Sequence, residues 1–261
     1  MLNTAIQAAL EAGKFLTANV GNIKNIERKI GQETNLVTEI DKQSEALIIQ
    51  KIHAQFPDHM VLGEESGAGA GGADYKWIID PLDGTTNYTH GLPLFCVTIG
   101  IEHNGEIIAG VTYDPNTDEL FTAEKGKGAF LNGKRISVSG ADRLINSLLV
   151  TGFPYNVKEN PSNVIQHFVN FLPVAQAVRR LGSAALDLAY VACGRFDGYW
   201  EVFLNPWDKG AGILLVKEAG GVVTNFSNDP NDIIYNPNTL ATNGLIHQQM
   251  LDVIGRTRIN Q

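Results

Sequence analysis

The chain has 261 residues, which fits one large domain or two small ones. Its formal net charge of −8 argues against nucleic acid or an anionic membrane as a direct partner. No apolar run reaches the ~18 residues of a membrane span and the first residues lack the basic start of a signal peptide, so we expect a cytoplasmic protein. Cys96 and Cys193 lie among apolar neighbours and are expected to be buried free thiols.

The first half of the chain has the pattern of two helices that cover an antiparallel sheet. Apolar residues at helical spacing predict helices over 2–20 and 41–56. Short apolar or alternating runs predict strands over 60–62, 77–79, 95–111 with a hairpin turn at 104–105, 119–123, 128–131 and 134–138. The polar residues 22–36 are expected to form a mobile loop, and the glycine-rich residues 67–74 a flexible surface loop.

The second half changes character around residues 140–147, where strands begin to alternate with helices. Strands are expected over 147–151, 196–201 and 222–225, and helices over 162–171, 183–193 and 206–219. This alternation indicates an α/β arrangement. We therefore predict an α+β part over 1–143 and an α/β part over 144–261, which pack as one unit because no linker separates them.

A buried strand over 77–79 runs directly into two like charges, Asp80 and Asp83. In an extended strand, residues i and i+3 point to opposite faces of the sheet. Pro81 removes a ladder donor and keeps Asp80 out of a helical conformation, so we expect the chain to leave the sheet here and to turn both carboxylates to one side. Gly84 then gives the backbone freedom for the close approach of a ligand.

The two carboxylates need a compensating charge. At a separation of about 4 Å they repel by roughly 4 kcal/mol when the effective dielectric constant is near 20. Glu64 and Glu65 follow another short strand and are expected nearby, and so many carboxylates exceed what a shared proton can neutralise. Ligation by oxygen atoms alone suits Mg²⁺. Asp and Gly are also ordinary turn residues, which leaves a structural turn as the alternative.

A further acid, Asp208, follows Asn205 and Pro206 in the sequence. Asn205 can cap a helix whose first residue is Pro206. Asp208 then lies at the third helical position, where a negative charge is favourable in any case. Its position alone therefore leaves both a helix-capping role and a ligand role open.

Several motifs together resemble one family. They are LVTEID (36–41), GEES (63–66), WIIDPLDGTTN (77–87), RRLGSAALDLAYVACGRFDGYWE (179–201) and PWDKGAGILLVKEAGG (206–221). The chain resembles the inositol monophosphatase family over nearly its whole length, and it is most similar to the bacterial members of the extragenic-suppressor type. The resemblance implies a five-layered αβαβα sandwich, α+β and α/β in character, of the sugar-phosphatase type that fructose-1,6-bisphosphatase shares.

The resemblance also implies a Mg²⁺-dependent, lithium-sensitive site with two or three cations. The carboxylates and the one backbone carbonyl that hold these cations are Glu64, Asp80, Leu82, Asp83 and Asp208. Asp80 is implied to touch two of the cations, and Glu64 to lie near the weaker third one. Lys29, in the loop over 22–36, is the nearest candidate for a lysine close to that third cation.

Further roles follow from the same resemblance. Glu64 and Thr85 are implied to orient the attacking water while Asp41 steadies Thr85, although Asp41 as a simple helix N-cap is the alternative. The residues implied to contact the phosphate are Gly84, Thr85 and Thr86. The positions implied to meet substrate hydroxyl groups are Asp83, Gly182, Ser183, Ala184 and Glu201.

We therefore expect a phosphomonoesterase that hydrolyses inositol 1-phosphate or a similar small polyol phosphate with a metal-activated water. The same chemistry on another ester is the nearest alternative, as a 3′(2′),5′-bisphosphate nucleotidase or a fructose-1,6-bisphosphatase. A regulator that binds RNA polymerase is the alternative from a different class. The resemblance also implies a homodimer, with Arg179 and Arg180 near the interface unless this pair is simply solvent-exposed.

Overall fold

The structure is a computed structural model that describes residues 1–22, 26–28, 36–69 and 74–256. Lys29 and most of the expected loop around it lie outside these residues. The α-helices of the described part are α1 (Leu2–Asn19), α2 (Glu39–His53), α3 (Thr85–Thr89), α4 (Val164–Phe171), α5 (Ala184–Ala192), α6 (Pro206–Glu218) and α7 (His247–Gly255). None of these described helices has both the length and the apolar character that crossing a membrane requires.

The larger sheet has eight strands in the order β10-β9-β8-β7-β6-β5-β3-β4. These strands are β3 (Met60–Gly63), β4 (Gly67–Ala68), β5 (Tyr75–Asp83), β6 (Cys96–His103), β7 (Glu106–Asp114), β8 (Glu119–Glu124), β9 (Gly128–Leu131) and β10 (Lys134–Arg135). Neighbouring strands are antiparallel except β3 and β5, which are parallel. The parallel pair brings the ends of β3 and β5 to the same edge of the sheet, where the expected acids follow.

The smaller sheet has five strands in the order β12-β11-β13-β15-β14. These strands are β11 (Leu148–Thr151), β12 (Ala177–Arg179), β13 (Gly198–Glu201), β14 (Val222–Thr224) and β15 (Thr239–Thr242). β11 is parallel to both β12 and β13, whereas β15 is antiparallel to β13 and β14. A separate two-stranded pair, β1 (Ile26–Arg28) and β2 (Leu36–Thr38), stands where a loop was expected.

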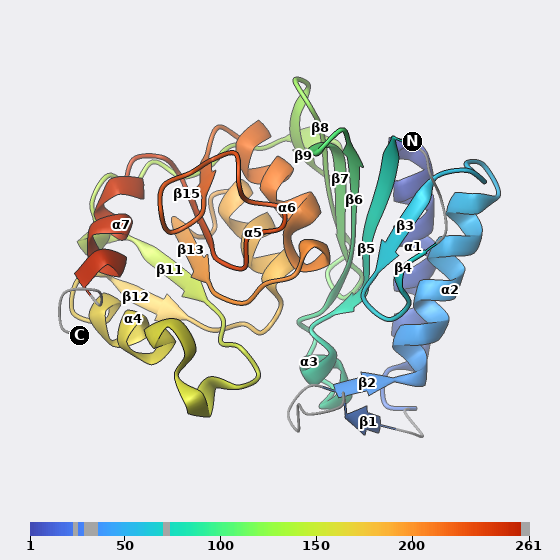
Figure 1. The fold of residues 1–261 in the computed structure, drawn as a ribbon, viewed down its shortest axis with the longest axis horizontal. Coiled ribbons are helices and arrows are strands. Elements are labelled where there is room, and N and C mark those ends of the chain that lie inside the picture. The colour runs from blue at the N-terminus through green and yellow to red at the C-terminus, as the bar shows by residue number, and fades with distance from the viewer. Residues whose placement is uncertain (23–25, 29–35, 70–73, 257–261) are drawn as a thin grey trace.

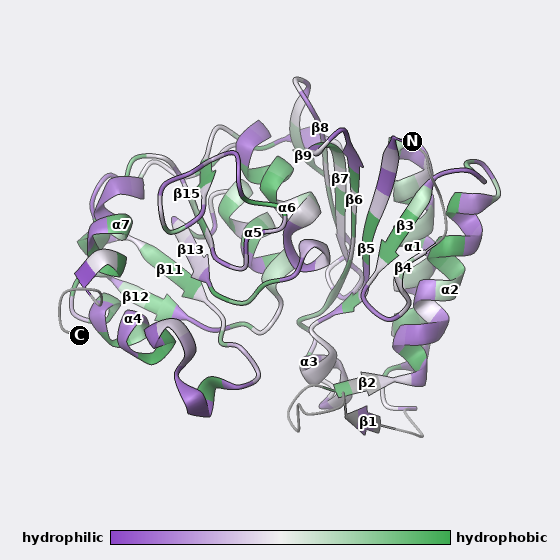
Figure 2. Cartoon of the chain, viewed as in Figure 1, coloured by the Kyte–Doolittle hydropathy of each residue, from purple (hydrophilic) through white to green (hydrophobic). Residues whose placement is uncertain are grey.

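The elements stack in five layers, so the predicted αβαβα sandwich is confirmed (Figure 1). Helices α1 and α2 cover the outer face of the larger sheet, and α5 and α6 lie between the two sheets. Helices α4 and α7 cover the outer face of the smaller sheet, where their apolar side chains share a cluster with β11 and β13. Figure 2 shows hydrophobic residues along the strands of both sheets, while the outer helices also carry hydrophilic residues.

Strand β5 corrects the prediction that the chain leaves the sheet at Asp80. The strand continues through Pro81 to Asp83. Asp80 pairs with Thr98 and Asp83 pairs with Cys96, so β5 has one residue more than β6 over this interval. Such a β-bulge changes the alternation of faces. The bulge therefore accounts for two aspartates three positions apart on one side of a strand that stays in the sheet.

Other differences concern the ends of elements and elements that we did not predict. Helix α2 begins at Glu39 rather than at 41, because Thr38 caps it and accepts a hydrogen bond from Ile40 N at 3.1 Å. The glycine-rich stretch contributes strand β4, and residues 70–73 lie outside the described part. Besides β1, β2 and β4, which lie where loops were expected, the structure adds β12, β15 and α7 to the predicted elements.

Helix α6 lies directly on the larger sheet, at two glycines that face each other. Gly100 of β6 pairs with Gly110 of β7. A Cβ atom at Gly110 would lie 2.9 Å from Ala211 Cα, and one at Gly100 would lie 3.1 Å from Ala211 N. Only glycine permits this approach of helix and sheet. The two glycines therefore set the depth at which α6, and Asp208 near its start, sit against the sheet.

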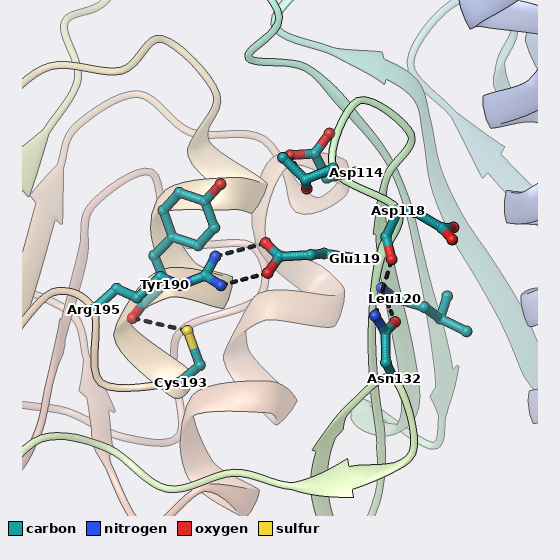
Figure 3. A network of polar contacts seen from close by, with 9 residues as sticks. Asp114, Asp118, Glu119, Leu120, Asn132, Tyr190, Cys193 and Arg195 are labelled. Atoms are coloured by element: carbon teal, nitrogen blue, oxygen red, sulfur yellow. Dashed lines mark hydrogen bonds and ion pairs between the residues drawn. The ribbon is translucent and has the colours of Figure 1, made fainter.

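A polar contact also joins β8 to the segment that follows α5 (Figure 3). The Arg195 guanidinium donates two hydrogen bonds to the Glu119 carboxylate, one of them at 2.6 Å to Oε2, and lies 4.8 Å from the centre of the Tyr190 ring. Cys193, beside it, is free and half-buried rather than buried as expected, whereas Cys96 is free and buried. The contact fixes α5 relative to the larger sheet.

Candidate active site

Four carboxylates meet where β3, β5 and α6 approach one another. Asp80, at the bulge of β5, is only 2% exposed. Burial raises the pKa of Asp80 well above its ordinary value. Three neighbouring carboxylates add to this rise in the pKa, and they are Glu64, Asp83 and Asp208. The structure therefore brings together all the carboxylates that the sequence singled out as cation ligands.

Asp83 connects this cluster to α5. Its Oδ2 accepts hydrogen bonds from Ser183 Oγ at 2.6 Å and from Ala185 N at 2.8 Å. Burial raises the pKa of Asp83 to about 6, although these donors oppose the rise. The backbone donors belong to the first turn of α5, whose N–H groups have no partner within the helix. Asp83 thus satisfies the start of α5 and belongs to the acidic cluster at the same time.

Asp208 caps its helix and also lies beside the other acids of the cluster. Asn205 precedes α6 as its N-cap and Pro206 is the first helical residue, as predicted. Asp208 Oδ2 accepts a hydrogen bond from Asn205 N at 2.6 Å. Burial raises the pKa of Asp208 well above its ordinary value, and the negative charge of the nearby Glu64 adds to this rise. One oxygen therefore caps the helix while the carboxyl group lies within the acidic cluster.

Asp41 and Thr85 lie in contact, as expected. Thr85 Oγ1 is 3.1 Å from Asp41 Oδ1 and 3.1 Å from Leu82 O, which are alternative acceptors for its one proton. Asp41 is not an N-cap: it is the third residue of α2, and its Oδ2 accepts hydrogen bonds from Thr38 N at 2.8 Å and Thr38 Oγ1 at 2.5 Å. Asp41 therefore links the start of α2 to the threonine after the bulge.

The three residues expected at the phosphate form the start of the short helix α3. Gly84 is its N-cap, with a φ of 95° in the left-handed region. A Cβ atom there would lie 2.8 Å from Leu94 O, so no other residue fits. Thr85 and Thr86 follow as the first helical residues, where N–H groups point away from the helix and can meet an anion.

Two residues of α2 position this site and were missed in the sequence. Ser44 Oγ donates to Pro81 O at 3.0 Å and so holds the bulge. Glu45, 3% exposed, accepts from Glu65 N at 2.9 Å and from Ser66 N at 2.8 Å, which holds the turn that carries Glu64. Their signal was available: polar residues occupied the helical face expected to be apolar.

The other residues expected at the substrate lie at the start of α5 and at the end of β13, and Ser183 joins them to Asp83. Gly182, Ser183 and Ala184 lead into α5, and Ser183 is its N-cap. Tyr199 OH donates to Glu201 Oε2 at 2.7 Å, and burial raises the pKa of Glu201 to about 7. Glu201 lies on the backbone of Gly152, where a Cβ atom would come within 2.2 Å of Glu201 Oε2.

Two further residues at this place were missed. Asn87 Nδ2 donates to Leu94 O at 2.7 Å and to Leu181 O at 2.9 Å, so this buried amide joins α3 to the segment before α5. Tyr155 is partly exposed, but its hydroxyl group is shielded from solvent, which raises its pKa, and the four carboxylates of the cluster raise this pKa further. An aromatic side chain of the second half therefore stands beside the acidic cluster.

The donor set has the chemistry of a site for a hard divalent cation. It consists of oxygen atoms whose like charges raise one another's pKa. In the described part of the chain, no group of three or more His, Cys, Asp or Glu side chains is already arranged so that it could hold a metal ion. Hydrogen bonds engage one oxygen each of Asp80, Asp83 and Asp208. The second oxygen of each of these aspartates remains for a cation, and an all-oxygen set suits a hard divalent ion, so the residues fit the group.

A cavity lies elsewhere in the described structure, between the segment around Leu144 and α7. Its volume is about 270 Å³. Its lining consists of Arg143, Leu144, Ile145, Val174, Gln249, Asp252, Val253 and Arg256. None of these residues belongs to the acidic cluster, so the cavity is not the site at which the chemistry gathers.

The fold and the acidic cluster together define a class of protein. An αβαβα sandwich whose carboxylates come from two neighbouring strands of one sheet and from a helix between the sheets is a sugar-phosphatase fold. The sequence matches the model of the inositol monophosphatase family over residues 1–257. The chain belongs to the inositol monophosphatase family and is a phosphatase.

Similar proteins cover nearly the whole chain. The inositol-1-monophosphatase of Synechocystis sp. is 45% identical over 257 residues, which are 98% of this chain and 89% of that protein. Nus factor SuhB of Escherichia coli K12 is 43% identical over 252 residues, 96% of this chain and 94% of that protein. The crystal structure of the extragenic suppressor protein suhB from Bartonella henselae has a TM-score of 0.91 at 40% identity and covers 97% of both chains. The resemblance found in the sequence motifs is confirmed.

Proposed function

We propose that the chain hydrolyses inositol 1-phosphate, or a similar small polyol phosphate, with two or three Mg²⁺ ions. The observation that carries this proposal is the meeting of four carboxylates beside the start of α3. A phosphate dianion is repelled by such a cluster unless cations stand between them. Bound Mg²⁺ would remove this repulsion, lower the pKa of the attacking water and offset the charge of the leaving alkoxide.

The ligands divide into two sets that share Asp80. One cation would be held by Glu64, Asp80 and the carbonyl oxygen of Leu82. A second cation would be held by Asp80, Asp83 and Asp208, and a third would be bound near Glu64. Leu82 O also lies 3.1 Å from Thr85 Oγ1, and a carbonyl oxygen has lone pairs for both partners.

Thr85 and Glu64 would orient the attacking water. When the Thr85 hydroxyl donates its proton to Asp41 Oδ1, its oxygen is left as an acceptor. A water proton can then point at Thr85 or Glu64, which directs an oxygen lone pair toward phosphorus. The N–H groups of Gly84, Thr85 and Thr86 would receive the phosphate oxygens.

The polyol would lie between the cluster and the start of α5. Asp83 and Glu201 would accept hydrogen bonds from its hydroxyl groups, and Gly182, Ser183 and Ala184 would line the same place. Glu201 is half-buried, and its carboxyl group rests on the backbone of Gly152, which fixes its direction. A rigid carboxyl group beside the phosphate favours a substrate with hydroxyl groups near its ester.

The test is phosphate release by the purified chain with Mg²⁺ or EDTA, each with and without lithium. The substrates compared are inositol 1-phosphate, 3′-phosphoadenosine 5′-phosphate and fructose 1,6-bisphosphate. We expect Mg²⁺-dependent, lithium-inhibited turnover with the highest kcat/KM for inositol 1-phosphate, and loss of all turnover in Asp80→Asn. Preference for the nucleotide or the bisphosphate would reject the polyol assignment, and equal rates in EDTA would reject the cation site.

A second candidate function is association with RNA polymerase, which the name of the relative Nus factor SuhB favours. Binding of this kind needs no hydrolysis. Purified polymerase should therefore retain the Asp80→Asn variant as well as the unchanged chain in a pull-down assay. Failure of both proteins to bind would remove this candidate and leave the enzymatic proposal intact.

The assembly that we propose is a cytoplasmic homodimer. Arg179 and Arg180 are exposed in the single chain and precede α5. Two free thiols suit a reducing compartment. Analytical ultracentrifugation should show a dimer that Arg180→Glu weakens, and a monomer at all concentrations would contradict this assembly.

A further inference from the structure

Lys209 is a buried cation next to one of the proposed cation ligands. It follows Asp208 in α6 and is 0% exposed. Its ammonium group donates hydrogen bonds to Asn236 O and, at 3.2 Å, to Thr239 Oγ1, and it forms no ion pair with any residue that the structure describes. Burial of a charge that only neutral acceptors hold is unfavourable. An apolar side chain of similar length would pack here without that cost, so packing does not account for the amine.

The two acceptors of Lys209 lie at the entrance to β15. Thr239 is the first residue of β15, and it pairs with Glu201, the last residue of β13. Glu201 is the carboxyl group proposed to meet a hydroxyl group of the polyol. The ammonium group of Lys209 therefore joins α6, which carries Asp208, to the pair of strands that carries Glu201.

The same segment also holds the chain on the other side of Asp208. Leu204 N, before the start of α6, donates to Pro237 O at 2.9 Å. Residues 236–239 thus contact the chain before Asp208 through Leu204 and after it through Lys209. Two such contacts restrict the direction of the Asp208 carboxyl group more than either contact alone, which is the support that a ligand side chain requires.

We propose that Lys209 is a positioning residue that sets the distance between Asp208 and Glu201, and so between the cation end and the hydroxyl end of the bound polyol phosphate. This inference rests on the proposed function and deepens it. Asp208 would help to hold a cation at the phosphate, and Glu201 would accept a hydroxyl group of the same molecule. Loss of a group that orients a metal ligand typically lowers the metal affinity about 10- to 100-fold.

Charge and position make opposite predictions for the loss of the ammonium group. A bound cation is repelled by a nearby ammonium group, so Lys209→Met would tighten cation binding if only the charge mattered. The same substitution weakens the binding if Lys209 positions Asp208. Lys217→Met is the matched control, because Lys217 lies exposed in the last turn of the same helix and its loss removes an equal charge far from residues 236–239.

The experiment titrates Mn²⁺, in place of Mg²⁺, into the full chain and measures the free ion by electron paramagnetic resonance. The binding event that Asp208→Asn weakens most identifies the cation that Asp208 holds. For this cation we expect the Kd to rise about 10-fold or more in Lys209→Met. The rise should be smaller in Thr239→Val, which removes one acceptor of the ammonium group, and absent in Lys217→Met. The melting temperature of Lys209→Met in EDTA should not fall, because an apolar side chain replaces a buried charge.

A double-mutant cycle tests whether Lys209 acts through Asp208. Asp208→Asn combined with Lys209→Met should lower the kcat/KM for inositol 1-phosphate no further than Asp208→Asn alone, because the group that Lys209 positions is already lost. Independent effects that multiply would show that Lys209 acts elsewhere and would overturn the inference.

Mn²⁺ binding that is tighter or unchanged in Lys209→Met would overturn the inference as well. If Lys209→Met does not fold, Thr239→Val takes its place: weaker Mn²⁺ binding in this variant supports the inference, and unchanged binding rejects it. If the unchanged chain binds no Mn²⁺, the proposed function itself falls and the inference with it. Mn²⁺ binding in the unchanged chain that Lys209→Met does not weaken rejects the inference alone.

Discussion

Asp83 shows how one side chain serves the fold and the chemistry together. Its Oδ2 holds Ser183 Oγ and Ala185 N, at the start of a helix that lies between the sheets. The same carboxyl group belongs to the acidic cluster around Asp80. The sequence offered a structural turn and a cation site as alternatives for these aspartates, and the contacts of Asp83 show that it has a structural task in either case.

Two substitutions separate these tasks. Asp83→Ala leaves the two donors at the start of α5 without an acceptor, so we expect it to lower the free energy of unfolding by about 2–4 kcal/mol. Asp83→Asn keeps an acceptor oxygen and should stay within about 1 kcal/mol of the unchanged chain. Both should lose about 100-fold or more of the Mg²⁺-dependent activity. Urea unfolding in EDTA measures the free energy of unfolding of the two variants. Equal destabilisation by both substitutions would contradict the separation of the structural task of Asp83 from its chemical one.

His247 gives the fold a pH dependence of its own. Its ring nitrogens lie 3.0 Å from Thr224 Oγ1 and 2.9 Å from Thr242 Oγ1, and burial lowers its pKa to about 4. An unfolded histidine titrates near about 6.5. Between these values the unfolded chain binds the proton and the folded chain does not, so stability falls as the pH falls. The loss reaches at most about 3 kcal/mol. The free energy of unfolding of His247→Gln, subtracted from that of the unchanged chain at each pH, should show this slope, and parallel curves would contradict it.

At the residue scale, the sequence revealed residues whose type and position indicate a chemical role. Asp80 and Asp83 stood out because acids that directly follow a buried strand are unexpected, whereas the position of Asp208 left its role open. Glu45 acts by holding a neighbouring turn, and its signal was only a polar residue on the inner face of a helix.

At the scale of elements, the approach of α6 to the larger sheet decides where Asp208 lies. The helix crosses β6 and β7 at Gly100 and Gly110, and its backbone occupies the space that side chains would fill. The sequence predicted each of these elements but gave no distance between them, because close approach depends on which glycines face each other across two strands.

Gly110→Ala tests this dependence. The new Cβ atom would lie 2.9 Å from Ala211 Cα, which is backbone and cannot rotate away. We expect a loss of about 1–3 kcal/mol of stability and a smaller rise of melting temperature on adding Mg²⁺, because α6 carries Asp208. Gly140→Ala is the control, since no described atom lies within 4 Å of the place that its Cβ atom would take, and it should change stability by less than about 0.5 kcal/mol. Equal effects of the two substitutions would show that the contact with α6 is not limiting.

The elements that sequence patterns missed have physical reasons in common. β12 and β15 have three and four residues, too few to display a period. The bulge in β5 depends on pairing with β6, which a proline in the sequence did not disclose. Long periodic helices and the hairpin at 104–105 were predicted well because their signals are local, whereas β-pairing is set by partners distant in the chain.

At the scale of the whole molecule, the like charges of the acidic cluster act against the packing of α6 on the larger sheet. Asp83 titrates at a pKa of about 6 in the fold because of burial, above its unfolded value near about 4. The folded chain without metal therefore binds more protons than the unfolded chain between these values, and this contribution to stability falls as the pH rises through that window.

Removal of the metal should leave the repulsion within the acidic cluster uncompensated and so lower the stability of the folded chain. In EDTA the melting temperature should be lower than in saturating Mg²⁺, because the ion binds the folded chain in preference to the unfolded one. The difference should be larger near about pH 8 than near about pH 5.5, because protons compete with the cation for the same oxygens. Calorimetry with EDTA and with Mg²⁺ at both pH values measures it. A difference that is constant with pH would show that the carboxylates are not the binding groups.

Strand β15 has a consequence for how the molecule is made. It lies between β13 and β14, although both precede it in the chain. During synthesis, β13 and β14 have no strand between them until residues 239–242 have emerged. Hydrogen-bonding edges of the smaller sheet stay open during this interval, which favours association between nascent chains. The carboxylates of the larger sheet are synthesised long before β15. The smaller sheet, on the other side of α6, can form only after β15 has emerged, so the fold is completed late in synthesis.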